Sequence, residues 1–247
     1  CIIDVRCFDN GNLMKNKFLK AALAAVILAT TSTSANAGLI DPSSVLLNDA
    51  GATMLENWYG QGDLDWNSIW YGTSGATSQS WHNAVNGIAN TFSIFKITYN
   101  NSTYLIGGFN SGVWSNSSNY VHGLSENFIF NLTSNFYHDT SNALWTNNQY
   151  TTYNSSSYFP TFGGGHDLWG CAGNLGNGNS NYVGSYNGGF NTSKGNIVNQ
   201  TNQFVSFQVS ALETFTVSKA AAVSGPSTLA IFALGLLGLV SRRLLKR

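Results

Sequence analysis

Charged side chains are scarce in this sequence: they make up 9% of the 247 residues, and most of the cations lie near the two ends. Between residues 38 and 219 the only cations are Lys96, Lys194 and Lys219, against nine acidic residues, which gives this stretch a net charge of −6. A protein that binds a phosphate backbone needs a cluster of cations. Three scattered lysines do not form one, so we exclude nucleic acid as a partner.

Cysteines and metal-ligand motifs are also scarce. Cys1 and Cys7 precede Met14, which leaves Cys171 as the only thiol in the central stretch and excludes an intramolecular disulfide there. No His-x-His, HExxH or Cys-x-x-Cys spacing occurs, and no Lys-Ser/Thr follows a glycine run, so we predict no metal site and no cofactor. Two interpretations of Cys171 stay open: a small packed residue beside a glycine turn, or a reactive thiol that protects against oxidants.

The N-terminal region has the pattern of a secretory signal peptide. Residues 14–37 begin with a lysine-rich stretch, continue through the apolar run Ala21–Ala29 and end at the small-residue site Ala35-Asn36-Ala37. We therefore expect cleavage between Ala37 and Gly38, with residues 1–13 as an upstream translation artefact. The alternative is a buried helix that opens a globular domain.

The C-terminal region, residues 220–247, has the pattern of a linker, one transmembrane helix and a basic tail. Residues 220–240 carry no charge, and a cluster with Arg242 and Arg243 follows, which is typical of a membrane segment with its basic end in the cytoplasm. The alternative is a buried helix.

This tail resembles the PEP-CTERM sorting signal of Gram-negative bacteria. The similarity rests on the apolar helix, the arginines and the segment Pro226-Ser227-Thr228-Leu229, although Ser224-Gly225-Pro226 stands where the motif has Pro-Glu-Pro. The resemblance implies an anchor in the inner membrane, cleavage by an exosortase-type enzyme, and delivery to the cell surface or into exopolysaccharide.

The central stretch predicts a mainly β domain of the α+β kind. Apolar residues at helical spacing favour short helices over residues 46–58, with Asp49 as a candidate cap, and over 78–87. Residues 91–109 predict a β-hairpin that turns at Asn100-Asn101-Ser102, with a change of phase at Phe95 that would fit a bulge. Further strands are expected over 126–132, 204–209 and 213–217, and residues 170–202 are interpreted as surface loop with short strand pieces.

Several short motifs occur in one order along this stretch. They comprise a double glycine with a following tryptophan and a triple glycine with a following His-Asp, namely Gly107, Gly108, Trp114, Gly163, Gly164, Gly165, His166 and Asp167. Together with the strands they resemble the TLDc domain over about residues 45–217. The resemblance implies a two-sheet antiparallel β-sandwich with a few short helices across domain 38–219, and it implies no settled catalytic reaction.

Four side chains are the candidates for acid–base chemistry: His82, His166, Asp167 and Glu213. For each one a structural role competes with the catalytic one: a helix-face or core histidine for His82, hydrogen bonds that fix the glycine turn for His166 and Asp167, and a solvated strand position for Glu213. Exposed tryptophans could stack on sugars, and packing in the core is the alternative for all of them, Trp66, Trp70, Trp114 and Trp169.

These patterns favour an exported protein of the cell envelope or exopolysaccharide with a non-catalytic binding or structural role. A catalytic role is not settled by the sequence. The alternatives are an envelope hydrolase, which requires the four candidates to converge in a pocket, and protection against oxidative stress.

Overall fold

A computed structural model describes residues 38–141, 150–181, 184–188 and 195–221. Within them the compact unit runs from Gly38 to Ala220 and is mainly β, as predicted. The predicted signal peptide, the transmembrane helix and the basic tail lie outside the described residues. In the described part of the chain, no helix is long and apolar enough to cross a membrane.

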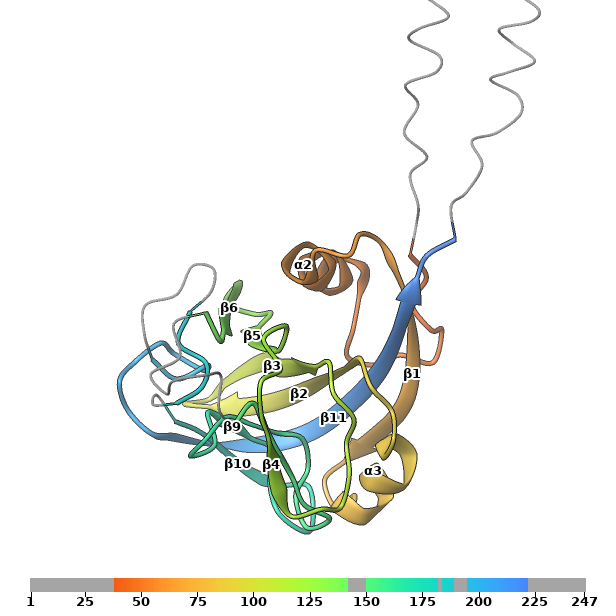
Figure 1. Cartoon of the computed structure of the whole chain (residues 1–247). Helices are drawn as coiled ribbons and strands as arrows, with labels where there is room; N and C mark the ends of the chain where they lie inside the picture. The colour runs from red at the N-terminus through yellow and green to blue at the C-terminus, as the bar shows by residue number, and fades with distance from the viewer. Residues whose placement is uncertain (1–37, 142–149, 182–183, 189–194, 222–247) are drawn as a thin grey trace, which may run out of the picture. The chain divides into compact units, whose positions relative to one another are not determined.

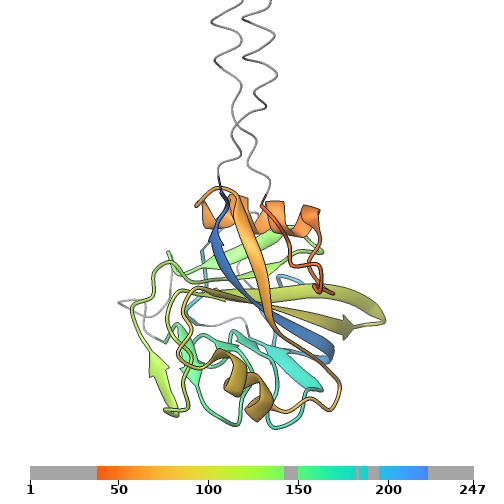
Figure 2. The ribbon, with the colours of Figure 1, turned by 90° about the vertical axis from the view of Figure 1, so that its right-hand side faces the viewer.

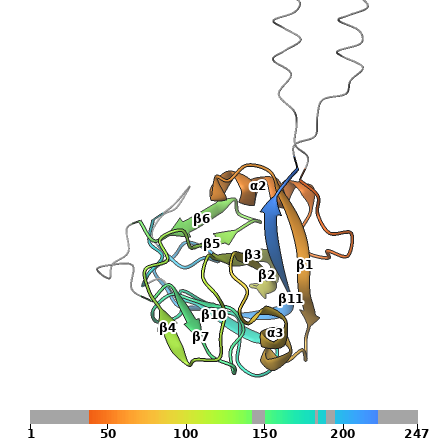
Figure 3. The same cartoon turned by 45° about the vertical axis from the view of Figure 1, so that its right-hand side comes forward.

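Two short helices accompany the sheet in the described residues: α2 (Asp49–Tyr59) and α3 (Ser78–Val85). Both predicted helices are confirmed, although the cap of α2 is the Asn48 side chain, which accepts a hydrogen bond from the Gly51 amide, and not Asp49. The two helices lie at opposite ends of the unit, as Figure 1 and Figure 3 show.

The strands form one continuous antiparallel sheet. It runs in the order β4-β7-β8-β9-β10-β11-β2-β3-β5-β6, and β1 also pairs with β11. The bounds are β1 (Leu64–Thr73), β2 (Thr91–Tyr99), β3 (Ser102–Asn110), β4 (Asn119–Val121), β5 (Phe128–Asn131), β6 (Phe136–Asp139), β7 (Thr152–Asn154), β8 (Thr161–Phe162), β9 (Leu168–Trp169), β10 (Asn177–Ser180) and β11 (Val205–Lys219). The prediction of two separate sheets is therefore corrected.

The long strand β11 is the reason that the sheet is continuous. One edge of β11 pairs with β2, and its other edge pairs first with β10 and then with β1. A register shift between Val209 and Ala211 reverses which side chains face which core. The two strands predicted over 204–209 and 213–217 are thus one strand with a bulge, which crosses the whole unit in Figure 1 and Figure 2.

Strand β2 separates two cores. Phe92 and Ile94 belong to the core beside α2, which we call the α2-side core, and Phe95 and Ile97 belong to the core that contains Trp81 of α3, the α3-side core. The pairing of β2 with β3 continues without a shift, so the bulge predicted at Phe95 is absent. The apparent change of phase arises because both faces of β2 are buried.

The predicted hairpin of β2 and β3 is confirmed. Its turn is made by Asn100 and Asn101, whose φ angles are 48° and 62°. Two successive positive φ values give the turn type whose twist matches that of the flanking strands.

Candidate functional site

The triple glycine forms the turn between β8 and β9. Gly163 and Gly165 have positive φ angles of 82° and 79°, and a Cβ on Gly163 would lie 2.3 Å from Oδ2 of Asp167. Only glycine fits there, since a side chain would clash with the carboxyl and strain the backbone. The turn therefore closes tightly around the Asp167 side chain.

Asp167 is buried beneath that turn. Its Oδ2 atom accepts hydrogen bonds from the backbone amides of Ser185 at 2.7 Å and Tyr186 at 3.0 Å. Its Oδ1 atom has no hydrogen-bond partner among the described residues. Burial raises the pKa of Asp167 to about 7, and the two amide bonds oppose this shift. The carboxyl thus joins the glycine turn to the segment at 184–186.

His166 points away from this carboxyl. Its φ angle is 64°, and its half-buried ring packs against Tyr153, Tyr158 and Trp169, stacking on Trp169 at 6.2 Å between ring centroids. Burial lowers the pKa of His166. No hydrogen bond joins the His166 and Asp167 side chains in the described structure, so the two neighbours do not form an acid–base pair.

His82 holds α3 against the loop that precedes β8. Its Nε2 atom lies 2.7 Å from the Ser155 carbonyl oxygen and 3.0 Å from the Tyr158 carbonyl oxygen, and its Nδ1 atom lies 2.7 Å from the Asn86 side chain. The ring is 1% exposed, so both nitrogens are occupied by the protein and are closed to a substrate.

Glu213 is fully buried, which corrects the interpretation of a solvated strand residue. Its carboxylate accepts hydrogen bonds from the amides of Val45 and Leu46, the latter at 2.7 Å, and from the Ser68 hydroxyl at 2.8 Å. Buried charges in proteins are paired or hydrogen-bonded in this way. Glu213 therefore fastens the segment before α2 to β1 and β11.

The four candidate side chains do not share a site. Glu213 contacts the segment at 44–46 and β1, His82 contacts the loop at 155–158, and Asp167 contacts residues 185–186. In the described residues no group of three His, Cys, Asp or Glu side chains is placed to hold a metal ion.

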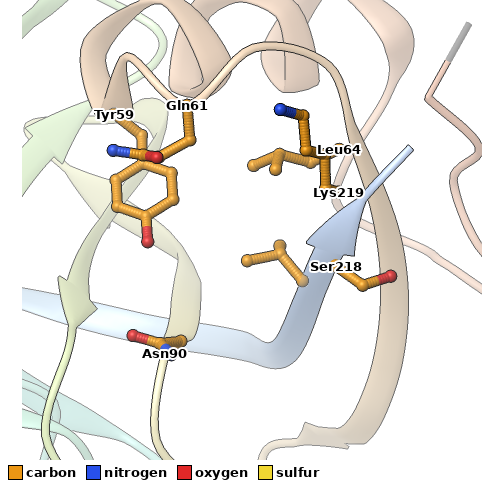
Figure 4. A pocket seen from close by; sticks show the side chains of 7 residues that line it. Tyr59, Gln61, Leu64, Asn90, Ser218 and Lys219 are labelled. Carbon is orange, nitrogen blue, oxygen red and sulfur yellow. The ribbon is translucent and has the colours of Figure 1, made fainter. Parts of the chain in front are cut away.

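Two hollows of the described surface lie elsewhere, near the end of β11. Figure 4 shows the first, which Tyr59 and Gln61 border from the end of α2, Asn90 from the start of β2, and Lys219 from β11. The second lies beside Asp65 and Ser218. Neither of these two hollows is lined by any of the four candidates.

Cys171 is buried beside the turn that follows β9. Its Sγ atom accepts a hydrogen bond from the Gly176 amide, and burial raises the pKa of the thiol to about 11. A reactive thiol needs exposure and a lowered pKa. The geometry therefore favours the packed-residue interpretation.

The four candidate tryptophans divide into two pairs. Trp66 and Trp114 are buried, and their indole nitrogens donate to Glu56 and to Thr91. Trp70 and Trp169 are half-buried. Trp169 alone of the four belongs to a larger group of partly exposed rings.

That group, the ring strip, covers the outer face of β4, β7 and β9 and their loops. Neighbouring ring centroids are 4.7 to 6.2 Å apart, and the members are Tyr120, His122, Tyr150, Tyr153, Tyr158, His166 and Trp169. Apart from His166 and Trp169, no sequence pattern singled these rings out. Strands of two and three residues are too short to show a period of two, which is the signal that could have found them.

Comparison with known families identifies the domain. The model of the TLDc domain family matches residues 42–218, which is most of the chain. The match includes every residue of the sheet except Lys219, the last residue of β11. A search of curated proteins gave no match.

Proposed function

Since this chain belongs to the TLDc domain family, we propose that it is an exported TLDc domain of the cell envelope whose role is to bind rather than to catalyse. The observation that carries the proposal is that the four candidate side chains lie apart and make structural contacts. Three of them are buried in hydrogen bonds that hold the fold together, and His166 packs among aromatic rings. A hydrolase needs a nucleophile or water between a convergent acid and base.

Export and anchoring are part of the same proposal. The signal pattern in residues 14–37 supports translocation with cleavage between Ala37 and Gly38. The apolar segment with Arg242 and Arg243 supports an anchor in the inner membrane of a Gram-negative bacterium. The segment Pro226–Leu229 supports removal of that anchor by an exosortase-type enzyme and delivery to the surface or into exopolysaccharide.

The two alternatives have weaker support. An envelope hydrolase lacks a shared pocket for its acid and base, as described above. Protection against oxidants through Cys171 lacks an accessible thiol, because the side chain is 2% exposed and its pKa is raised.

The test is to express the full chain in a Gram-negative host that has an exosortase, then to fractionate the cells and measure intact masses. We expect a mature N-terminus at Gly38 and the folded domain in the envelope or medium. A matched variant, Leu23→Arg, places a charge in the apolar run and should hold the precursor in the cytosol. Recovery of the unprocessed wild-type chain from the cytosol would refute the proposal.

A further inference from the structure

We propose that the ring strip binds a neutral polysaccharide chain, an inference that rests on the proposed binding role and names its ligand class. The rings on the strands lie on one face of the sheet. Tyr120 of β4 is paired with Tyr153 of β7, and Trp169 of β9 is paired with Thr161 on one side and with Asn179 on the other. Directly paired residues share a face of the sheet, so these side chains form one row across the strands.

That row lies on the outer face. The residues that alternate with this row point inward. Phe162 of β8, Leu168 of β9 and Phe207 of β11 belong to the α3-side core. An outer face of an antiparallel sheet normally carries charged or small polar side chains. Here it carries partly exposed aromatic rings, which is unusual. Exposed patches of this kind mark interaction sites, so we infer a partner that contacts the rings.

Charge decides what kind of partner fits. Among residues 111–125 and 150–188 the only ionisable acid is Asp167, which is buried, and the sequence has no lysine or arginine there. The acidic side chains gather instead between residues 41 and 65. A strongly charged polymer would lose its hydration at this strip and gain no ion pair in return, so a neutral ligand is favoured.

The chemistry of the rings favours a sugar over an apolar protein segment. The tyrosines and histidines of the strip carry a hydroxyl or an imidazole, while the indole N–H of Trp169 is buried. The large exposed hydrophobic residues lie elsewhere, at Leu39, Val45, Tyr71, Val113 and Phe204. Such rings combine a flat apolar face with a polar tip. A neutral sugar ring presents the complement, since it has C–H groups on its faces and hydroxyls around its edge. Asn179 and Ser206, paired on the next strands of the row, add hydrogen-bonding groups.

The strip is also held in place before any ligand arrives. The rings contact one another, and Asp167 secures from beneath the glycine turn that carries His166. Binding therefore orders few side chains, which lowers its entropic cost.

The test is affinity electrophoresis of the detergent-purified full chain through native gels that contain dextran, a soluble β-glucan, galactomannan or alginate. Alginate is the anionic control. We expect at least one neutral polysaccharide to retard the protein, and we expect Tyr153→Ala and Trp169→Ala each to weaken that binding about tenfold, since each removes a ring on which a sugar would stack. Tyr153→Phe, which keeps the ring, should retain most of the binding.

Tyr71→Ala is the matched control, because Tyr71 is 42% exposed on β1 and lies outside the strip. Its binding should equal that of the wild type, and melting temperatures show that each variant is folded. Absence of retardation by every neutral polysaccharide, undiminished binding in both alanine variants, preferential binding of alginate, or capture of a protein through the strip would each overturn the inference. If the wild type is exported and processed yet fails these gels, the ligand assignment is wrong while the proposed export and envelope location stand.

Discussion

Single buried carboxylates fasten distant segments of this domain together. Glu213 binds the amides of residues 45 and 46, and Asp167 binds those of residues 185 and 186, so each carboxylate joins parts of the chain that are far apart in sequence or on opposite sides of a loop. Hydrogen bonds from amides to a charged acceptor are stronger than those between neutral groups. The two residues act alike in this respect, and burial raises the pKa of Asp167 to about 7.

Replacing Glu213 by glutamine tests the hydrogen bonds that its carboxylate makes to residues 45 and 46. At either oxygen position the new amide NH₂ would face a backbone amide that can only donate, Val45 at one and Leu46 at the other. We expect the free energy of unfolding to fall by about 2–3 kcal/mol, as measured by urea denaturation. Glu126→Gln is the control, because Glu126 is exposed, and it should change stability by less than about 0.5 kcal/mol. Equal stability of the two variants would contradict the role given to Glu213.

The raised pKa of Asp167 predicts a pH-dependent stability. The pKa of Asp167 in the folded protein, about 7, lies above the ordinary aspartate value of 3.8, so the contribution of this group is fully present below pH 4 and is lost as the pH rises to about 7. Between pH 5 and pH 8 the free energy of unfolding should fall by about 2–3 kcal/mol on this account.

The measurement is urea denaturation at both pH values for the wild type, Asp167→Asn and Asp49→Asn. Asp167→Asn should lack this fall because asparagine does not titrate. Asp49 is exposed, and its variant should keep the wild-type dependence. An identical pH dependence in Asp167→Asn and the wild type would show that Asp167 is not the titrating group.

At the scale of elements, the local turn chemistry of the β2–β3 hairpin sets the register of the central strands. The φ angles of Asn100 and Asn101 are both positive, a conformation that asparagine tolerates and β-branched residues do not. The whole β2–β3 pairing, from Thr91 opposite Asn110 to Tyr99 opposite Ser102, follows from that turn.

Asn101→Val should therefore lower the free energy of unfolding by about 1–2 kcal/mol, because valine would be held in the left-handed region. The same substitution at Asn67, an exposed position in the extended strand β1, should be neutral or mildly stabilising. Thermal unfolding of the two variants measures the difference, and an equal loss at both positions would exclude turn strain as the cause.

The elements that sequence patterns located correctly are those with local signals. Both helices, the β2–β3 hairpin and the strand containing Phe128 and Phe130 have enough residues to show their period. Strands β7, β8 and β9 have three residues or fewer, so they show no period and were not located individually. The burial of Glu213 was missed for a different reason: its partners lie about 145 to 168 residues away in the chain.

For the whole molecule, the sharing of β2 and β11 by both cores predicts cooperative unfolding. Phe92 and Phe95 of β2, and Phe207 and Phe215 of β11, face different cores from the same strands. Neither core can lose its strands while the other stays intact.

The full chain should thus show one unfolding transition, with coincident midpoints by tryptophan fluorescence and far-UV circular dichroism. Phe109→Leu in the α2-side core and Phe162→Leu in the α3-side core should both move that same midpoint downward, since both side chains are fully buried. Two separate transitions, each shifted by only one of these variants, would show that the halves fold independently.

The sequence by itself determined the β-rich class, the two helices, the central hairpin and the family, because these depend on periodicity, turn residues and glycine motifs that are read along the chain. The tertiary structure alone decided that the sheet is continuous, that the four candidate acid–base residues lie apart, and that partly exposed rings from three short strands form one outer row. The physical reason is that the pairing of strands far apart in the sequence determines which side chains become neighbours. The register brings Tyr120, Tyr153 and Trp169 together across long stretches of chain, which no local pattern encodes.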